Sequence, residues 1–152
     1  MNYVDIVKKA LVRTYDKNIL FPSEIGICVR RSYFIRQSEA VIMQVTELMD
    51  IGSVYHEYVE ETLRKDYNCE VEKFIEDEIE GIKIHGKADA ICQHDLIELK
   101  VSGYIPQLPK FYHLYQVSLY YHALKKQNVQ IENVYIIYIN RNTNDCLLYT
   151  SG

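Results

Sequence analysis

The sequence contains no long apolar run, and we do not expect its first residues to form a leader for secretion. No segment reaches the roughly 18 apolar residues of a membrane-spanning helix. The first residues, MNYVDIVKKALVRTYD, are amphipathic and charged, unlike a signal peptide. The 152 residues also contain no internal repeat, low-complexity segment or linker. These absences exclude a membrane span and predict a cytoplasmic protein that forms one domain over residues 1–152.

A surplus of basic residues is absent as well. The chain has 17 Lys and Arg against 21 Asp and Glu, a net charge of −4, whereas nucleic-acid-binding domains are usually basic. The acidic balance does not exclude nucleic acid, because a metal site concentrates carboxylates and a bound cation offsets their charge. Six acids lie between Glu70 and Glu80, and we expect this segment to form a solvated strand edge or loop.

The cysteines are few and follow no paired motif. They are Cys28, Cys69, Cys92 and Cys146, and none belongs to a C-x-x-C pair. Without such a pair or a secretory signal, the pattern predicts free thiols and no disulfide.

The spacing of apolar residues changes from helical to strand-like and back along the chain. Helical spacing predicts helices over residues 2–15, from Pro22 onward, and over 46–65 and 110–127. A period of two predicts a three-strand meander at 70–79, 82–92 and 95–101, with further strands at 134–139 and 146–150. This order predicts an α/β fold with a mixed central sheet flanked by helices.

Three charged residues interrupt the apolar meander. The stretch GKADAICQHDLIELKVS places Asp89, Glu98 and Lys100 among β-prone residues, where charges are costly unless they are paired or bind a ligand. If Gln93 and His94 form the turn, Asp89 opposes Glu98 in the hairpin. Lys100 then shares their face, because side chains alternate along a strand.

The sequence leaves two interpretations of this charged group open. Directly opposed carboxylates destabilise a sheet, and a Mg²⁺ or Mn²⁺ ion between Asp89 and Glu98 reverses that effect, because oxygen ligands suit these ions. Lys100 would then orient a water molecule or accept its proton. The alternative is a salt-bridged surface patch in which Lys100 partly neutralises the two acids.

Two helical motifs flank the meander. In GSVYH, His56 lies beside the apolar stripe of its helix, and Gly52 costs roughly 1 kcal/mol against alanine, so we expect Gly52 to pack closely against a neighbour. In QVSLY, Gln116 and Tyr120 lie four residues apart on one helix face. The alternatives are a packing histidine and the polar flank of an amphipathic helix.

These motifs occur in the order G-x-x-x-H, D, E-x-K and Q-x-x-x-Y. This ordered set resembles the RecB-type nucleases of the PD-(D/E)xK superfamily, over most of the chain from residue 23 to about residue 140. Upstream, PSEIGICVRRSYFIR looks like the cysteine–arginine–aromatic segment of the CRISPR-associated RecB-like exonucleases, the four-cysteine iron–sulfur family, and of their viral and stand-alone relatives. The resemblance implies a restriction-endonuclease-like core.

The resemblance also implies a metal site and a catalytic lysine. His56, Asp89 and Glu98 would bind Mg²⁺ or Mn²⁺ together with the backbone carbonyl of Leu99. Lys100 would be the catalytic lysine beside the two acids. A histidine among the ligands favours Mn²⁺ somewhat over Mg²⁺.

Further roles follow from the same resemblance. Gln116 and Tyr120 would complete the catalytic set by holding the lysine, a water molecule or a DNA strand. Arg30 and Arg31 match the basic pair that follows the family's first cysteine and would contact DNA phosphates. A solvated helix face is the alternative for the two arginines.

The chain departs from this family at its cysteines. Cys28 fits the first cluster position, but after the strand ending near Asn140 only Cys146 remains, and Cys69 and Cys92 fall in other segments. We therefore expect no iron–sulfur cluster, and we expect Cys28 to be a buried apolar residue.

These features predict metal-dependent hydrolysis of DNA phosphodiester bonds, with single-stranded DNA or DNA ends as the substrate. Tyr104 or Tyr112 would stack on bases, although packing in a loop or core is the simpler expectation for each. A catalytically weak nuclease-fold module that binds DNA or a protein partner is the alternative, and a tyrosine-rich interaction protein is another. A second copy of the chain and a CRISPR or recombination protein also stay open as partners.

Overall fold

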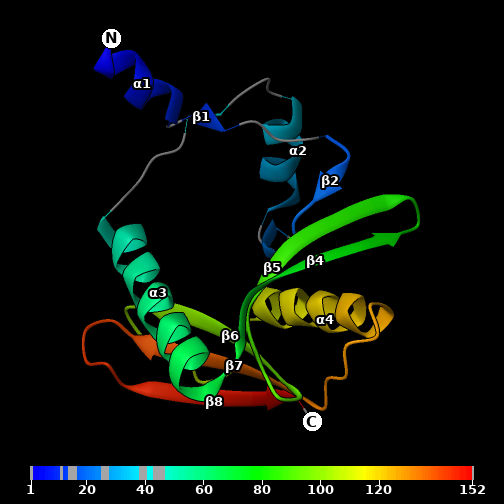
Figure 1. The fold of residues 1–152 in the computed structure, drawn as a ribbon. Coiled ribbons are helices and arrows are strands. Elements are labelled where there is room, and N and C mark those ends of the chain that lie inside the picture. Colours follow the sequence, from blue (N-terminus) through cyan, green and yellow to red (C-terminus); the bar gives the residue numbers. More distant parts are fainter. Residues whose placement is uncertain are drawn as a thin grey trace.

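The computed structural model describes residues 2–10, 12–13, 17–24, 28–37, 41–42 and 47–151 of the protein. Its centre is a mixed six-stranded sheet with the strand order β2-β5-β6-β7-β8, in which β4 also pairs with β5 (Figure 1). Helices flank this sheet, so the predicted α/β architecture is confirmed. Among the described residues, no helix is both long and apolar enough to cross a membrane.

The C-terminal two thirds of the chain follow the sequence pattern closely. The elements are α3 (Glu47–Tyr67), β4 (Glu70–Ile79), β5 (Ile82–Cys92), β6 (Asp95–Ser102), α4 (Phe111–Lys126), β7 (Asn133–Asn140) and β8 (Cys146–Ser151). The first three strands form the predicted antiparallel meander. The α4 helix then crosses over to β7, which pairs in parallel with β6, and β8 returns antiparallel.

The N-terminal part follows the pattern less well. Its elements are α1 (Tyr3–Ala10), β1 (Val12–Arg13), β2 (Ile19–Leu20), η1 (Pro22–Glu24), α2 (Val29–Gln37) and β3 (Val41–Ile42). The helix predicted over 2–15 ends at Ala10, and residues 11, 14 and 15 of that prediction lie outside the described part. The short strands β1 and β3 pair with each other, so distant partners rather than local periodicity determine them.

An arginine joins α2 to the rest of the fold. The guanidinium of Arg36 donates to both carboxylate oxygens of Glu24 and to the carbonyl of Ile19. The side chains of Arg36 and Glu24 are only 12% and 11% exposed. This pair therefore links α2 with η1 and β2, and β2 pairs with β5 of the central sheet.

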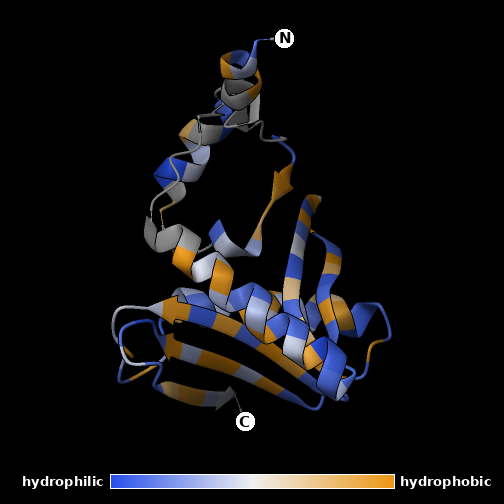
Figure 2. Ribbon diagram, turned by 60° about the vertical axis from the view of Figure 1, so that its left-hand side comes forward, coloured by the Kyte–Doolittle hydropathy of each residue, from blue (hydrophilic) through white to orange (hydrophobic). Residues whose placement is uncertain are grey.

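The main core lies where α4 packs on the sheet. Its buried side chains include Ile75, Leu96, Val117, Leu124 and Tyr138. Figure 2 shows apolar residues alternating with polar ones along the strands, as expected for strands with one face on a core.

The acidic segment forms an edge strand, as the sequence predicts. Among the described strands, β4 pairs with β5 alone, and most of its acids are exposed. Asp77 differs, because its side chain is only 4% exposed and accepts a hydrogen bond from Lys126 Nζ at 2.8 Å. The lysine thus anchors the end of α4 to this strand.

Two predictions about the cysteines are wrong. Cys69 and Cys92 form a disulfide, although the sequence pattern predicts none. The β4–β5 register brings them face to face, since Glu70 pairs with Ile91 and Cys69 and Cys92 are the next positions along. Cys28 is exposed rather than buried, because it lies immediately before α2, where its Sγ accepts a hydrogen bond from the backbone N–H of Arg31 at 3.4 Å.

Replacing Cys69 and Cys92 together with alanine should lower the free energy of unfolding by about 2–4 kcal/mol, because the unfolded chain regains the freedom that a cross-link removes. Denaturant titration under oxidising conditions measures this loss. Replacing the exposed Cys28 and Cys146 with alanine is the matched control and should change little. Equal losses in the two double variants would contradict the prediction.

Candidate active site

The candidate site lies where β5 and β6 separate. Their ladder runs in the predicted register from Cys92–Asp95 to Ala90–Ile97 and stops there, so the predicted pairing of Asp89 with Glu98 in the ladder is wrong. Beyond that pair, the backbone N–H of Leu99 donates to Asp89 Oδ2 at 2.7 Å. The carboxylate of Asp89 thus occupies the place of a strand partner at the fork between two strands.

The β4 strand is also irregular opposite this fork. Its ladder with β5 skips the position of Glu72, which would face Asp89. Glu72 has a φ of 51°, in the left-handed region that residues other than glycine seldom adopt. Non-glycine residues in such conformations are enriched at functional sites, and this one lies beside the predicted metal ligand.

His56 reaches the fork from α3. Its Nε2 lies 3.0 Å from the carbonyl oxygen of Leu99 and 3.5 Å from Asp89 Oδ2, and its Nδ1 lies 2.9 Å from the carbonyl oxygen of Gly52. Asp89 raises the pKa of His56 to about 9, against the effect of burial. In the metal-free protein the imidazole is therefore protonated at neutral pH and donates from both nitrogens.

Glu98 is the most deeply buried acid of the group, with 3% exposure. Its Oε1 lies 3.1 Å from Lys100 Nζ, and its Oε2 is buried without a hydrogen-bond partner among the described residues. Burial, and then the neighbouring Asp89 carboxylate, raise the pKa of Glu98 above its ordinary value. A buried oxygen without a partner is costly in a folded protein, which points to a ligand for this carboxylate.

A chain of hydrogen bonds holds Lys100. Its Nζ donates to Gln116 Oε1 at 2.7 Å, and Gln116 Nε2 donates to the hydroxyl of Tyr120 at 3.0 Å. Gln116 and Tyr120 are both buried. Gly86 leaves room for the tyrosine, because a Cβ there would lie 3.0 Å from Tyr120 Cε1. The structure thus brings together the two motifs that the sequence singles out on β6 and α4.

The donor set at the fork suits a hard divalent cation. Among the described residues, no three His, Cys, Asp or Glu side chains form a metal-binding group by themselves. However, two oxygen atoms lie close to His56 Nε2. The Leu99 carbonyl oxygen is 3.0 Å from this nitrogen, and Asp89 Oδ2 is 3.5 Å from it. Neighbouring ligands of an octahedral ion bound at about 2.1 Å are separated by about 3.0 Å, and the buried Glu98 Oε2 lacks a partner among the described residues. These are therefore the residues at the fork that could hold a divalent cation.

Sequence reasoning missed a histidine beside the lysine. His113 Nδ1 lies 2.6 Å from the hydroxyl of Tyr138. Burial, and then the charges of Lys100 and Lys110, lower the pKa of His113 to about 4. The imidazole is therefore neutral at pH 7. Its position three residues before Gln116, within one helical turn, was the signal available in the sequence.

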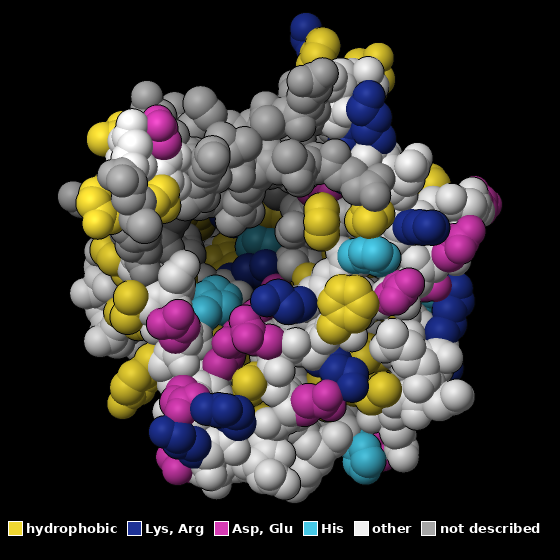
Figure 3. All heavy atoms as spheres, turned by 45° about the horizontal axis from the view of Figure 1, so that its top comes forward, with side chains coloured by type: hydrophobic (Ala, Val, Ile, Leu, Met, Phe, Trp, Pro, Cys, Tyr) yellow, Lys and Arg dark blue, Asp and Glu magenta, His cyan; other side chains and the backbone are white. Residues whose placement is uncertain are grey.

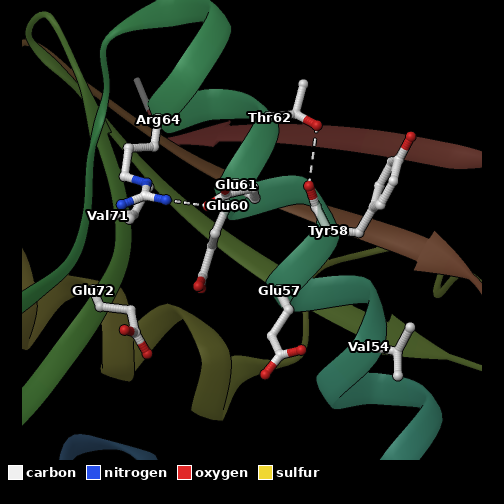
Figure 4. Close-up of a pocket in the computed structure, with 9 residues that line it drawn as sticks. All are labelled: Val54, Glu57, Tyr58, Glu60, Glu61, Thr62, Arg64, Val71 and Glu72. Carbon is white, nitrogen blue, oxygen red and sulfur yellow. Dashed lines mark hydrogen bonds and ion pairs between the residues drawn. The ribbon is translucent and has the colours of Figure 1, made fainter.

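Sequence reasoning also missed Glu60. This residue lines an open pocket of about 670 Å³ beside α3 and β4. Figure 4 shows Glu57, Glu60 and Glu72 around this pocket, with Arg64 paired to Glu61 at its margin. Burial, and then the carboxylates of Asp89 and Glu72, raise the pKa of Glu60 to about 7. Glu60 follows His56 by one helical turn, which would have marked it as facing the same side.

The two predicted DNA-binding arginines lie elsewhere. Arg30 and Arg31 are exposed on α2, and the guanidinium of Arg30 lies 5.7 Å from the centre of the Phe34 ring. Within the part of the chain that the structure describes, neither contacts the residues of the fork.

Figure 3 shows a hollow on one face of the molecule. Histidine, basic and acidic side chains gather around it.

Gly52 is not closely packed, contrary to the expectation from the sequence. A Cβ at this position would meet no described atom within 4 Å. Only its carbonyl takes part in the site, as an acceptor for His56.

Replacing Gly52 with alanine should therefore raise the free energy of unfolding by about 1 kcal/mol, because alanine favours the helix and loses less entropy on folding. Urea titration measures the change. Gly103→Ala is the matched control, since its Cβ would lie 2.7 Å from Arg141 Nη2 and should bring no gain. Destabilisation by Gly52→Ala would show that the position is crowded after all.

Stability should fall by about 1–2 kcal/mol as the pH decreases from roughly 6.5 to 4, because unfolded His113 then takes up a proton that the folded state resists. Below the folded pKa both states are protonated and the loss is complete. Thermal unfolding of the wild type and of His113→Gln over this range measures the difference. His94→Gln, at an exposed turn, is the control. An unchanged pH profile in His113→Gln would contradict this assignment.

Comparison with known proteins supports the fold of the chain and gives no information about its function. No protein-family model and no curated protein matches the chain. A solved structure, the crystal structure of SSO0001, is similar to it with a TM-score of 0.71 and 22% sequence identity, over 97% of this chain and 73% of that chain. This likeness agrees with an α/β fold that comprises a mixed sheet and flanking helices.

Proposed function

We propose that this protein is a metal-dependent deoxyribonuclease that hydrolyses phosphodiester bonds in single-stranded DNA or at DNA ends. One observation carries the proposal. Lys100 is held by the buried side chains of Glu98 and Gln116. It lies at the fork where His56, Asp89 and the Leu99 carbonyl converge. Carboxylates and an imidazole that can bind a metal ion, together with an ammonium group in the same site, suit hydrolysis of a phosphate ester.

The residues that would hold Mg²⁺ or Mn²⁺ are His56, Asp89, Glu98 and the Leu99 carbonyl. A divalent cation in that place lowers the pKa of a water molecule and offsets charge on the phosphate. Asp89 also accepts the N–H of Leu99, so the carboxylate and the neighbouring carbonyl are positioned by the same stretch of backbone.

Lys100 would stabilise the charge that develops on the reacting phosphate. Its ammonium is directed by Glu98 on one side and by Gln116 on the other. A donor that is already oriented stabilises a transition state without paying for reorganisation. Gln116 and Tyr120 would be positioning residues, because they act through the lysine.

Tyr120 serves this arrangement as a neutral phenol. Burial, and then the charge of Glu98, raise the pKa of Tyr120 far above its ordinary value. Its hydroxyl accepts from Gln116 Nε2. The ammonium of Lys100 can only donate, so it requires the amide oxygen of Gln116, and the tyrosine hydroxyl pairs with the amide nitrogen that is left.

Cleavage of end-labelled single- and double-stranded DNA in Mn²⁺, Mg²⁺ or EDTA tests the proposal. We expect cutting in the metals and none in EDTA, and we expect Glu98→Gln to lose it. Glu76→Gln, an exposed acid on β4, is the matched control and should cut normally. DNA binding without cutting in any metal would replace the enzyme by a binding module, and absence of both would favour an interaction protein.

A further inference from the structure

Exposed aromatic rings gather where α4 begins. Tyr104, Phe111 and Tyr115 are 58%, 57% and 53% exposed, and Tyr112 is half-buried between them and the site. We call these four residues and Lys110 the aromatic platform. Phe111 contacts both Tyr112 and Tyr115 edge to face, with ring centres 5.5 and 5.9 Å apart.

The platform is continuous with the candidate site. The ring of Tyr112 lies 4.6 Å from that of His113, and His113 contacts Tyr138 in the core. Tyr138 on β7 is the register partner of Lys100 on β6, so the side chains of these two residues lie on the same face of the sheet. A row of rings therefore leads from the surface to the lysine.

A cation lies among the exposed rings. Lys110 Nζ is 5.2 Å from the centre of the Tyr104 ring and 5.8 Å from that of Tyr112. Rings with open faces suit flat apolar groups, and an ammonium beside them suits an anion. An unpaired nucleotide strand presents both groups at regular intervals, since each base has a free face and each linkage carries a negative charge.

We propose that the aromatic platform binds the unpaired bases of the DNA strand next to the bond that is cut, with Lys110 at a phosphate. This inference rests on the proposed nuclease function, because it assigns the rings to the strand that enters the same site. In a duplex the bases are already stacked on one another, so the platform would favour single-stranded DNA over paired DNA.

Equilibrium binding separates the bases from the phosphates. We would measure the fluorescence anisotropy of a labelled oligothymidylate and of an abasic strand of equal length, both in EDTA so that no cutting occurs. We expect the oligothymidylate to bind at least about tenfold more tightly, since a base on an aromatic side chain commonly contributes that much or more. The double variant Phe111→Ala/Tyr115→Ala should lose this preference and leave binding of the abasic strand unchanged.

Two controls define the result. Lys110→Gln should weaken both strands by a similar factor, because it removes a phosphate contact. Tyr67→Ala removes a tyrosine that is 71% exposed at the end of α3, and it should change neither. Circular dichroism verifies that each variant is folded.

Equal binding of the two strands by the wild type would overturn the platform, as would no binding to either strand. The proposal would also be overturned if Tyr67→Ala lost the preference for oligothymidylate over the abasic strand to the same extent as the double variant. A change in sedimentation of the double variant with unchanged DNA binding would assign the rings to contact with a second copy of the chain. Base-dependent binding without cleavage in Mn²⁺ would instead leave the platform intact and refute the nuclease.

Discussion

Replacing Lys100 with methionine should lower the rate of metal-dependent DNA cleavage by at least about 100-fold, the loss typical of removing one preorganised donor from a reaction centre. Methionine keeps most of the side-chain volume, so the space beside Gln116 stays filled. The buried Glu98 would lose its cation, and it would then take up a proton, because the neutral acid tolerates burial. We therefore expect a folded protein that retains DNA binding.

Lys126→Met is a matched control for this variant. Lys126 also pairs with a deeply buried acid, since its Nζ lies 2.8 Å from Asp77 Oδ1, and the side chain of Asp77 is 4% exposed. The control removes a comparable ion pair at the far end of α4 and should cost stability but little activity. Single-turnover rates at saturating DNA compare the two. Equal loss of cleavage in both variants would mean that the effect of Lys100 is structural.

The affinity for Mn²⁺ should rise about tenfold for each pH unit between pH 7 and 9, because the ion and a proton compete for the same nitrogen of His56. The pKa of His56 is raised to about 9 by Asp89. In the metal-free protein, the protonated imidazole therefore contributes stability that is complete below about pH 6.5 and lost as the pH rises through 9. Metal binding is favoured where that contribution is lost.

Asp89→Asn should change both the affinity and its pH dependence. The pKa of His56 should fall toward its ordinary value, since its main cause is gone, and the rise in affinity above pH 7 should flatten. Loss of a charged ligand should also weaken Mn²⁺ binding by about 100-fold or more. Electron paramagnetic resonance of free Mn²⁺ measures the affinity.

His85→Gln supplies the comparison for this second prediction. The Nε2 of His85 lies 3.8 Å from Glu76 Oε1 on the β4–β5 hairpin, so it is another histidine beside an acid. Its replacement should leave Mn²⁺ binding unchanged at each pH. If Asp89→Asn kept the wild-type pH profile, a group other than His56 would be competing with the ion.

The meander and its charged residues could be predicted because local rules govern them. Alternation along β5 and β6, together with a two-residue turn, is enough to place Asp89, Glu98 and Lys100 near one another. Helical spacing likewise places Gln116 and Tyr120 on one face. The separation of the strands beyond the Ala90–Ile97 pair could not be predicted, because it depends on a side-chain carboxylate that replaces a backbone partner.

The remaining misses have separate causes. The pairing of Cys69 with Cys92 follows from the β4–β5 register, which the turn at Gly81 already implied. Cys28 was expected to be buried from its residue type, whereas its position at the start of α2 decides its exposure. The sequence does not single out His113, because the neutrality of its imidazole depends on burial and on the charge of Lys100, and neither is visible in one helix of sequence.

The parallel pairing of β6 with β7 has a consequence for the order of folding. The antiparallel strands β4, β5 and β6 are neighbours in sequence and can associate by short loops, whereas β7 reaches β6 only after the whole α4 crossover has been placed. Lys100 lies before that crossover, and Gln116 lies within it. We therefore expect the hairpin to form early on the folding pathway and the support of the lysine to form late, so that a partly folded chain carries its acids without an oriented lysine and is inert toward DNA.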